Sequence, residues 1–478
     1  MLFNSIEFAI FLPSIFLLYW LVFNKSLKLQ NILLLFASCY FYSVWDYRFL
    51  FLLLTSTLFD FVLGQKIYNS QNVSLKKFFF YGSILINLSV LFFFKYYNFF
   101  IDSFVDAFLE FGIHLNVSSL NLILPIGISF YTFHELSYII DIYKDRIKPE
   151  KNFVNYALFV TFFPLLVAGP IERATHLLPQ IKVKRNFDYQ KAIDGLRQIL
   201  WGLFKKIVIA DTCAGYVDMV FNNSDSYSGM SHIFAAILFA FQIYCDFSGY
   251  SDIALGSARL FGIELLQNFS FPYFSRDIAE FWRRWHISLS SWFRDYLYIP
   301  LGGSKGGKLL TLRNTIIIFI VSGFWHGANW TFIIWGGLHA LYFIPLLVFK
   351  RNRRNLNIVA QNRKLPTFSE FIAIFTTFCL TTFAWIFFRA KDLNHAIEYI
   401  INIFKESSSQ LQHLSINVIS VLIFGFMIIE WIGRENKYAI NKFLTGKSII
   451  IRWGFYAILI LMIFNFSGVK QQFIYFQF

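Results

Sequence analysis

Residues 316–349 decide the fold class, and their sequence is IIIFIVSGFWHGANWTFIIWGGLHALYFIPLLVF, without an Asp, Glu, Lys or Arg. A membrane-spanning helix needs roughly 20 consecutive apolar residues. This run is too long for one such helix and short for two, and glycines interrupt it. Basic residues flank both of its ends, which places both ends on the same side of a membrane. The pattern predicts a tight hairpin of broken membrane helices.

The rest of the chain has the same character. Of its 478 residues, 57% are hydrophobic and 15% are charged, whereas soluble domains carry about 25% charged residues. The sequence therefore predicts an all-α polytopic membrane protein, a bundle of about 10–12 membrane helices in a single integral membrane domain over 1–478. The other apolar stretches are Phe8–Phe23, Asn31–Val44, Phe49–Leu63, Phe78–Phe100, Leu120–Tyr143, Phe153–Gly169, Phe368–Phe388, Ile416–Ile432 and Ile449–Phe466.

The net charge of +14 comes from basic loops between the apolar stretches. Loops at Lys25, Lys66 and Lys144 alternate with neutral or acidic ones such as the loop at Asp106. Because basic loops stay in the cytosol, the three lysines are expected inside and the N-terminus outside. Orientation is the favoured explanation of the charge, although an anionic cytosolic cofactor could also use the basic surface, and we expect no nucleic-acid partner. The first segment lacks the basic start of a cleaved signal peptide and is expected to remain as a helix.

Two segments break the simple pattern of crossings. Phe153–Gly169 is apolar but contains Pro164 and has basic residues on both sides. This predicts a re-entrant hairpin, which is tolerated in a membrane only where protein or a cavity surrounds it. Ser248–Arg313 mixes arginines with tryptophans and is expected to form amphipathic helices at the cytosolic interface.

His326 is the first candidate for chemistry, in the sequence SGFWHGANW over Ser322–Trp330. Counted from Asn314, it lies roughly 18 Å along its helix, near the bilayer midplane. Ionisable residues at that depth are costly and usually functional. The flanking glycines would let a substrate or another helix approach closely. The alternative is a neutral histidine that hydrogen-bonds between helices.

Other histidines and carboxylates are weaker candidates. His286 lies in FWRRWHIS and could instead be an interfacial histidine packed beside tryptophan. His339, thirteen residues after His326, could face the same cavity, although packing is the favoured role. Asp246 and Asp252 could orient a histidine or form ion pairs with neighbouring arginines.

Several short motifs resemble known nucleotide, metal or nucleophile sites but lack the residues that such sites need. Residues 302–309 resemble a P-loop, but Leu309 replaces the residue that binds Mg²⁺ and no strand precedes them, so a flexible glycine turn is favoured. His134-Glu135 lacks a second histidine at the H-E-x-x-H spacing, and the cysteines lie far apart. We therefore expect no metal. There is no G-x-S-x-G elbow, and so no evident serine nucleophile.

Several stretches together resemble the membrane-bound O-acyltransferase (MBOAT) family, and more closely its bacterial branch with the alginate O-acetyltransferase membrane subunit. The likeness covers 1–347 as an MBOAT-like core, and residues 348–478 resemble it in hydropathy only. It implies a helical bundle around a tunnel, in which His326 is the catalytic histidine and His286 the second signature histidine. The matching stretches are FFPLLVAGPIER (Phe162–Arg173), YCDFSGYSDIALG (Tyr244–Gly256), Asn268–Gly303 and FWHGANWTFIIWGGLHAL (Phe324–Leu341).

The resemblance also implies substrates and partners. Acetyl-CoA would arrive from the cytosol as the donor, with no tightly bound cofactor, and a secreted or periplasmic SGNH-type partner would acetylate an extracytoplasmic polysaccharide, alginate-like or peptidoglycan. The expected location is the lipid of the bacterial inner membrane. His326 would act as general base or as a transient acyl carrier. Arg283, Arg284 and Arg294 would hold the CoA phosphates, with His286 positioning the donor at the cytosolic face.

Two other functions stay open at this point. One is D-alanyl transfer to teichoic acid within the same family. The other is a non-enzymatic polysaccharide transporter, which would predict inverted repeats or paired intramembrane carboxylates, and neither is evident in the sequence. One further departure from the resemblance is His134, where a glutamine would be expected.

Overall fold

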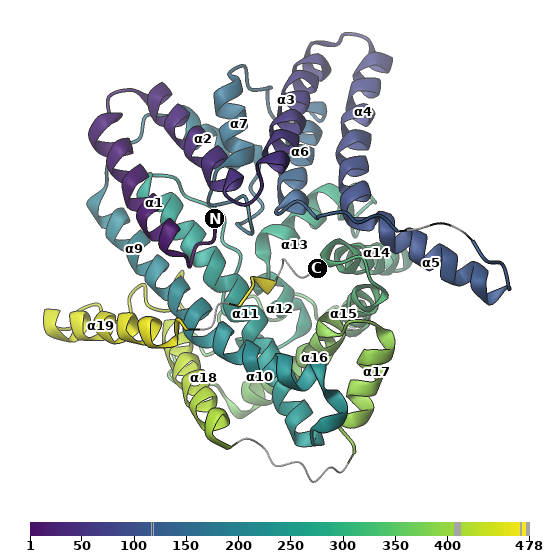
Figure 1. The fold of residues 1–478 in the computed structure, drawn as a ribbon, viewed down its shortest axis with the longest axis vertical. Helices are drawn as coiled ribbons and strands as arrows, with labels where there is room; N and C mark the ends of the chain where they lie inside the picture. The colour runs from purple at the N-terminus through teal and green to yellow at the C-terminus, as the bar shows by residue number, and fades with distance from the viewer. Residues whose placement is uncertain (116, 118, 406–412, 469–470, 475–478) are drawn as a thin grey trace. The chain divides into compact units, whose positions relative to one another are not determined.

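The computed structural model describes residues 1–115, 117, 119–405, 413–468 and 471–474. Every secondary-structure element assigned in these residues is a helix, and Figure 1 shows the helices with their labels. The chain forms two compact units, which we describe separately. Unit 1 comprises Met1–Ala192 with Ser257–Leu266, and unit 2 comprises Ile193–Gly256 with Gln267–Phe478.

In the described part of the chain, seven helical segments are long and apolar enough to cross a membrane. The prediction of a polytopic all-α membrane protein is thereby confirmed. Seven is fewer than the number expected, because several apolar stretches form shorter helices, among them Ile6–Val22 and Asn417–Gly433. The seven are α3 (Tyr47–Asn69), the segment Val73–Glu110 with α4 (Val73–Leu91) and α5 (Tyr97–Glu110), α11 (Gly229–Leu260), α14 (Lys308–His326), α15 (Trp330–Val348), α16 (Phe368–Arg389) and α19 (Ile449–Phe466).

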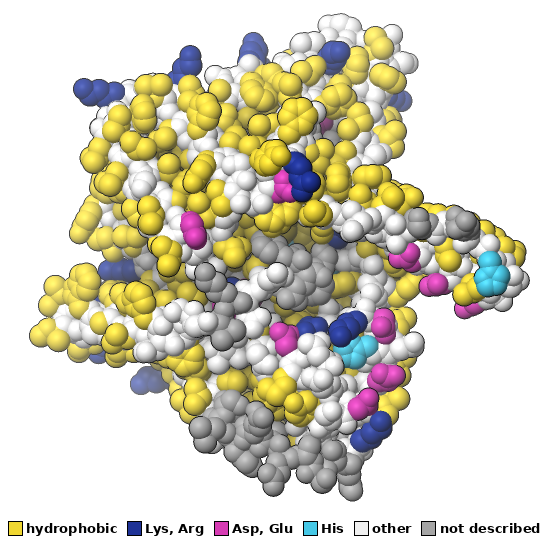
Figure 2. Space-filling model, in the orientation of Figure 1, with side chains coloured by type: hydrophobic (Ala, Val, Ile, Leu, Met, Phe, Trp, Pro, Cys, Tyr) yellow, Lys and Arg dark blue, Asp and Glu magenta, His cyan; other side chains and the backbone are white. Residues whose placement is uncertain are grey.

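Unit 1 packs its helices around α6 (Ile128–Tyr143), which is buried along almost its whole length against α3, α4 and α7 (Phe153–Thr161). On the face in Figure 2, hydrophobic side chains cover α1 (Ile6–Leu17) to α4, and Lys and Arg side chains gather along one end of the unit. Lys76, near the start of α4, pairs with Asp145, just after α6, 3.4 Å apart. The basic loops after α3 and α6 therefore lie together, as positive-inside orientation requires.

The apolar segment Phe153–Gly169, predicted to form a re-entrant hairpin, is helical only in its first part, α7. The nine residues of α7 are about 13 Å long, too short for a crossing, and Phe162–Arg173 continue as buried non-helical chain. Polar side chains from α2 (Leu27–Ser43) and α6 satisfy its backbone: Phe163 N–H donates to Ser38 Oγ at 2.9 Å and Glu172 N–H to His134 Nε2 at 3.1 Å. His134 thus supports this turn.

In unit 2, α14 and α15 form the hairpin predicted from residues 316–349. A Cβ on Gly323 would collide with the Phe332 carbonyl, and one on Gly336 with the Phe319 carbonyl, so the two backbones touch. Both helices have 19 residues. The sequence predicts two helices too short for full crossings, because the apolar run begins at Ile316, whereas α14 already begins at Lys308.

Candidate active site

His326 is the last residue of α14, so it lies at a helix end rather than mid-helix. The next residue, Gly327, has extended backbone and ends the helix. The imidazole is 3% exposed. Its ring centroid lies 5.1 Å from Trp335 of α15 and 5.3 Å from Phe388 of α16. Three helices therefore fix one histidine in an apolar pocket.

His286 connects α12 (Ile278–Arg284) to α13 (Ile287–Phe293). Its φ of +43° lies in the left-handed region, which costs a non-glycine residue about 1–2 kcal/mol. The side chain is 0% exposed, and its ring packs 4.7 Å from Phe247. Burial lowers the pKa of His286 to about 3, because desolvation disfavours the imidazolium. His286 is therefore a neutral histidine buried within unit 2, and its position at the cytosolic interface stays a prediction.

The structure brings the two predicted histidines together. The ring centroids of His286 and His326 are 6.5 Å apart, and Trp325 lies 6.0 Å from His286. The residues come from sequence positions 40 apart, and only the return of the chain through α13 and α14 unites them. Two imidazoles side by side in a buried pocket could accept, hold or pass a proton near pH 7.

His339 belongs to an aromatic cluster beside this pair. Its Nδ1 accepts a hydrogen bond from Trp282 Nε1 at 3.3 Å. Its ring lies 4.8 Å from Trp335, which in turn contacts His326. The favoured packing role of His339 agrees with this arrangement.

A cavity of about 710 Å³ opens between the α13–α14 connection, α14 and the end of α15. We call it the basic cavity, because its described lining residues include four cations and no carboxylate. Its apolar lining includes Phe319 and Phe343. The four cations are Arg294, Lys308, Lys350 and Arg353.

Helix α14 links the basic cavity to the histidine pair. Phe319, in the cavity lining, lies seven residues before His326, about 10 Å and two turns along the same helix face. Its ring is 5.4 Å from Trp282 and 6.4 Å from His339. Lys308, at the start of the helix, is about 27 Å from His326.

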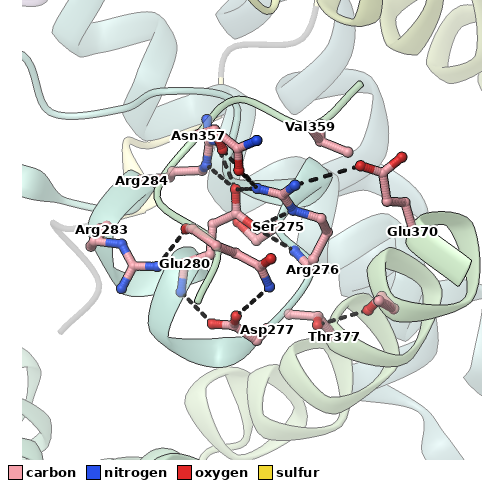
Figure 3. A network of polar contacts seen from close by, with 12 residues as sticks. Ser275, Arg276, Asp277, Glu280, Arg283, Arg284, Asn357, Val359, Glu370 and Thr377 are labelled. Atoms are coloured by element: carbon pink, nitrogen blue, oxygen red, sulfur yellow. Dashed lines mark hydrogen bonds and ion pairs between the residues drawn. The ribbon is translucent and has the colours of Figure 1, made fainter. Parts of the chain in front are cut away.

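The three predicted phosphate-binding arginines lie in different places. Arg294 lines the basic cavity and also contacts Asp295 at 2.7 Å. Arg284 is buried and pairs with Glu280 at 2.8 Å. Arg283 donates to the backbone carbonyls of Asn352 and Asn355, at 2.9 and 2.8 Å. Figure 3 shows Arg283 and Arg284 in a polar network around α12.

The carboxylates that could have paired with these arginines pair with lysines instead. Lys205 contacts Asp252 at 2.6 Å, and Lys206 contacts Asp246 at 2.8 Å. Lys206 also contacts Asp211 at 2.8 Å. Both lysines lie on one short helix over Phe204–Ala210, so these ions stabilise one another within unit 2 and leave the arginines of α12 to other partners.

Two buried carboxylates of unit 1 were missed from the sequence. Asp60 accepts hydrogen bonds from Ser83 and Asn87, and Glu135 accepts from Ser56 and Thr57. Both are 0% exposed. Paired intramembrane carboxylates were not evident in the sequence, and the structure shows these two buried carboxylates in unit 1. Their partners lie 23 to 79 residues away in the sequence, so no local spacing signals these pairs.

The cations Lys308, Lys350 and Arg353 were also missed. Loop lysines and arginines of a membrane protein indicate orientation, and this interpretation gave no reason to expect these three around one cavity. The glycine turn at 302–309 was rejected as a P-loop, but it contributes to the basic cavity, whose lining includes Ser304, Gly307 and Lys308.

Comparison with known proteins agrees with this architecture. Residues 8–388 match the family described as MBOAT, membrane-bound O-acyltransferase. The peptidoglycan O-acetyltransferase of Helicobacter pylori is 36% identical over 87% of this chain and 82% of its own. The probable alginate O-acetylase AlgI of Pseudomonas aeruginosa is 36% identical over 92% of this chain and 82% of its own. The teichoic acid D-alanyltransferase of Bacillus subtilis is 26% identical over 58% of this chain and 71% of its own.

The family match and the matches to the first two relatives extend past Leu347, where the resemblance was expected to end. They also cover the histidine pair, the basic cavity and α16. The chain belongs to the membrane-bound O-acyltransferase family and is a multi-pass membrane acyltransferase.

Proposed function

We propose that this enzyme takes an acetyl group from cytosolic acetyl-CoA and delivers it for O-acetylation of an extracytoplasmic polysaccharide, alginate-like or peptidoglycan. The observation that most supports this proposal is the arrangement along α14. The buried pair His286 and His326 lies at one end of this helix, and the basic cavity lies at the other. The two acetylating relatives match over more than four fifths of both chains, which supports acetyl as the transferred group.

The basic cavity suits the donor. Coenzyme A carries a phosphate monoester and a diphosphate on its nucleotide end, and its thioester lies at the far end of a flexible arm. Four cations near the phosphates would form charge-assisted hydrogen bonds. The volume of about 710 Å³ falls within the usual range for small-molecule sites. The apolar lining would take the arm and direct the thioester along α14.

In the proposed chemical step, neutral His326 accepts the proton of the acceptor hydroxyl as the oxygen attacks the thioester carbonyl. The new C–O bond forms, the C–S bond breaks, and the proton passes from His326 to the departing thiolate to give free CoA. His286 assists as a second neutral imidazole beside the proton. No serine nucleophile is evident in this chain, so the acceptor hydroxyl of this step would belong to a secreted or periplasmic SGNH-type partner. A polysaccharide hydroxyl would then attack the partner's acetyl ester, which transfers the acetyl group and restores the partner's hydroxyl.

The test of the function is donor use in membrane vesicles that contain the acceptor polysaccharide and the partner. Vesicles with the enzyme should transfer label from radioactive acetyl-CoA to the polysaccharide, and vesicles without it should not. Label accepted from a D-alanyl carrier protein, but not from acetyl-CoA, would favour the teichoic-acid alternative that the Bacillus subtilis relative represents. Family membership argues against a transporter.

The orientation of the proposed enzyme in the inner membrane gives a second prediction. With the N-terminus outside, the exposed residues Lys148 and Lys305 face the cytosol and Asp106 faces outward. In a cysteine-free background, Lys148→Cys and Lys305→Cys should react with a membrane-impermeant thiol reagent only after lysis. Asp106→Cys should react in intact cells. The reverse labelling pattern would place the basic cavity outside and overturn the cytosolic donor.

A further inference from the structure

The proposed reaction does not explain why the backbone after α15 is fixed by several hydrogen bonds to α12. The helix ends at Val348, and Lys350 then adopts a left-handed φ of +54° that turns the backbone. We call residues 350–355 the anchored segment. Within it, Lys350, Asn352 and Arg353 line the basic cavity.

Arg283 holds this segment by its backbone. Its two terminal nitrogens donate to the carbonyls of Asn352 and Asn355, which lie on either side of Arg353. Charge-assisted hydrogen bonds of this kind are about twice as strong as neutral ones. The Asn355 amide adds a 2.7 Å hydrogen bond to Asp277. The backbone on both sides of Arg353 is therefore tied to α12.

The support behind Arg283 is itself rigid. Glu280 is 1% exposed and lies between Arg276 and Arg284, with contacts of 3.0 and 2.8 Å (Figure 3). Asp277 caps the start of α12 by accepting from the Glu280 N–H at 2.7 Å. Helix α12 ends two residues before His286. The anchored segment and His286 thus depend on one short, salt-bridged helix.

We propose that Lys350 and Arg353 form the element that recognises the donor's phosphates, and that Arg283 positions this element without touching the donor. This inference rests on the proposed function and names the phosphate selectivity of its donor site. It differs from direct phosphate binding by Arg283, because both of its terminal nitrogens are already engaged by carbonyls. A lysine at position 283 would keep the charge but could not donate to both carbonyls with the planar geometry of a guanidinium.

The experiment compares two donors with purified protein in detergent, supplied with the partner and the acceptor polysaccharide, and follows the release of free thiol. Acetyl-CoA carries the phosphates, and acetyl-pantetheine has the same thioester arm without them. Arg353→Ala should raise the KM for acetyl-CoA roughly tenfold or more, as expected for loss of one charge-assisted contact. The KM for acetyl-pantetheine and both kcat values should stay within about twofold, because the lost interaction is the same in ground and transition states.

Arg283→Gln and Arg283→Lys should both raise the KM for acetyl-CoA and spare acetyl-pantetheine. The matched control is Arg354→Ala, which removes the same charge from an exposed neighbour outside the cavity lining and should behave as wild type. Rescue by Arg283→Lys would show that Arg283 acts by its charge and would overturn the positioning role. Equal effects of Arg353→Ala and Arg354→Ala would overturn the recognition element.

The same data separate this inference from the function itself. A wild-type enzyme that uses both thioesters with the same KM would contradict phosphate recognition while leaving acetyl transfer intact. A wild-type enzyme that consumes neither thioester would contradict the proposed donor chemistry. Similar yield and gel-filtration profile of the variants serve as the control for folding.

Discussion

His326→Ala should reduce acetyl transfer by about 10² to 10⁴-fold, the contribution of a general base in a positioned site. The proposed chemistry gives His326 the proton of the acceptor hydroxyl, and alanine offers no group that could take it. Membrane insertion should be unaffected, because the substitution replaces a polar residue of a membrane helix by a better helix former. The measurement is the O-acetyl content of the polysaccharide in cells that carry only the variant.

Two controls accompany this measurement. His114→Ala removes an exposed histidine from the loop after α5, in unit 1, and should leave acetylation normal. His326→Gln keeps a polar side chain of similar size but no basic nitrogen, and should be as inactive as the alanine variant. Normal acetylation in cells with His326→Ala, at wild-type protein level, would exclude His326 as the base.

His326 could be singled out from sequence because its signals are local. A histidine between glycines in a stretch without charged residues is unusual at any depth, and the close contact of Gly323 with Phe332 explains those glycines. Its position along the helix was wrong, because the count began at Asn314 and placed the residue in mid-helix. The apolar run does not show that Lys308 to Arg313 already belong to α14.

The burial of His286 was hidden by its neighbours. Two arginines and two tryptophans beside a histidine are typical of a membrane interface. In the structure, Glu280 neutralises Arg284 one helix turn away, and carbonyls engage Arg283, so α12 lies in the protein interior. The i, i+4 spacing of Arg276, Glu280 and Arg284 was the available sign, since it predicts ion pairs within the segment.

The basic cavity could be recognised only from the folded structure. Its cations come from residues 294–308 and 350–353, which lie far apart in sequence and meet only because α14 and α15 return as a hairpin. Loop cations that orient a membrane protein and loop cations that bind a donor have the same composition. The hairpin was predictable, but the residues that face its open end were not.

The structure changes the expected role of His286. A histidine at the cytosolic surface would position the donor, and its loss would raise the donor KM alone. His286 is instead buried, neutral and 6.5 Å from His326. A group at this place would act on the proton that His326 carries, an interaction that strengthens as charge develops in the transition state.

His286→Ala should therefore lower kcat for acetyl-CoA by about 10²-fold or more and change the donor KM little. Because the two imidazoles would act on one proton, the double variant His286→Ala/His326→Ala should be hardly slower than the worse single variant, as for residues that work as a unit. The measurement is kcat and KM from donor titrations of the purified proteins. Additive losses in the double variant would show independent roles. A raised KM with wild-type kcat would return His286 to donor positioning, and would mean that its left-handed, strained backbone serves packing against Phe247 rather than chemistry.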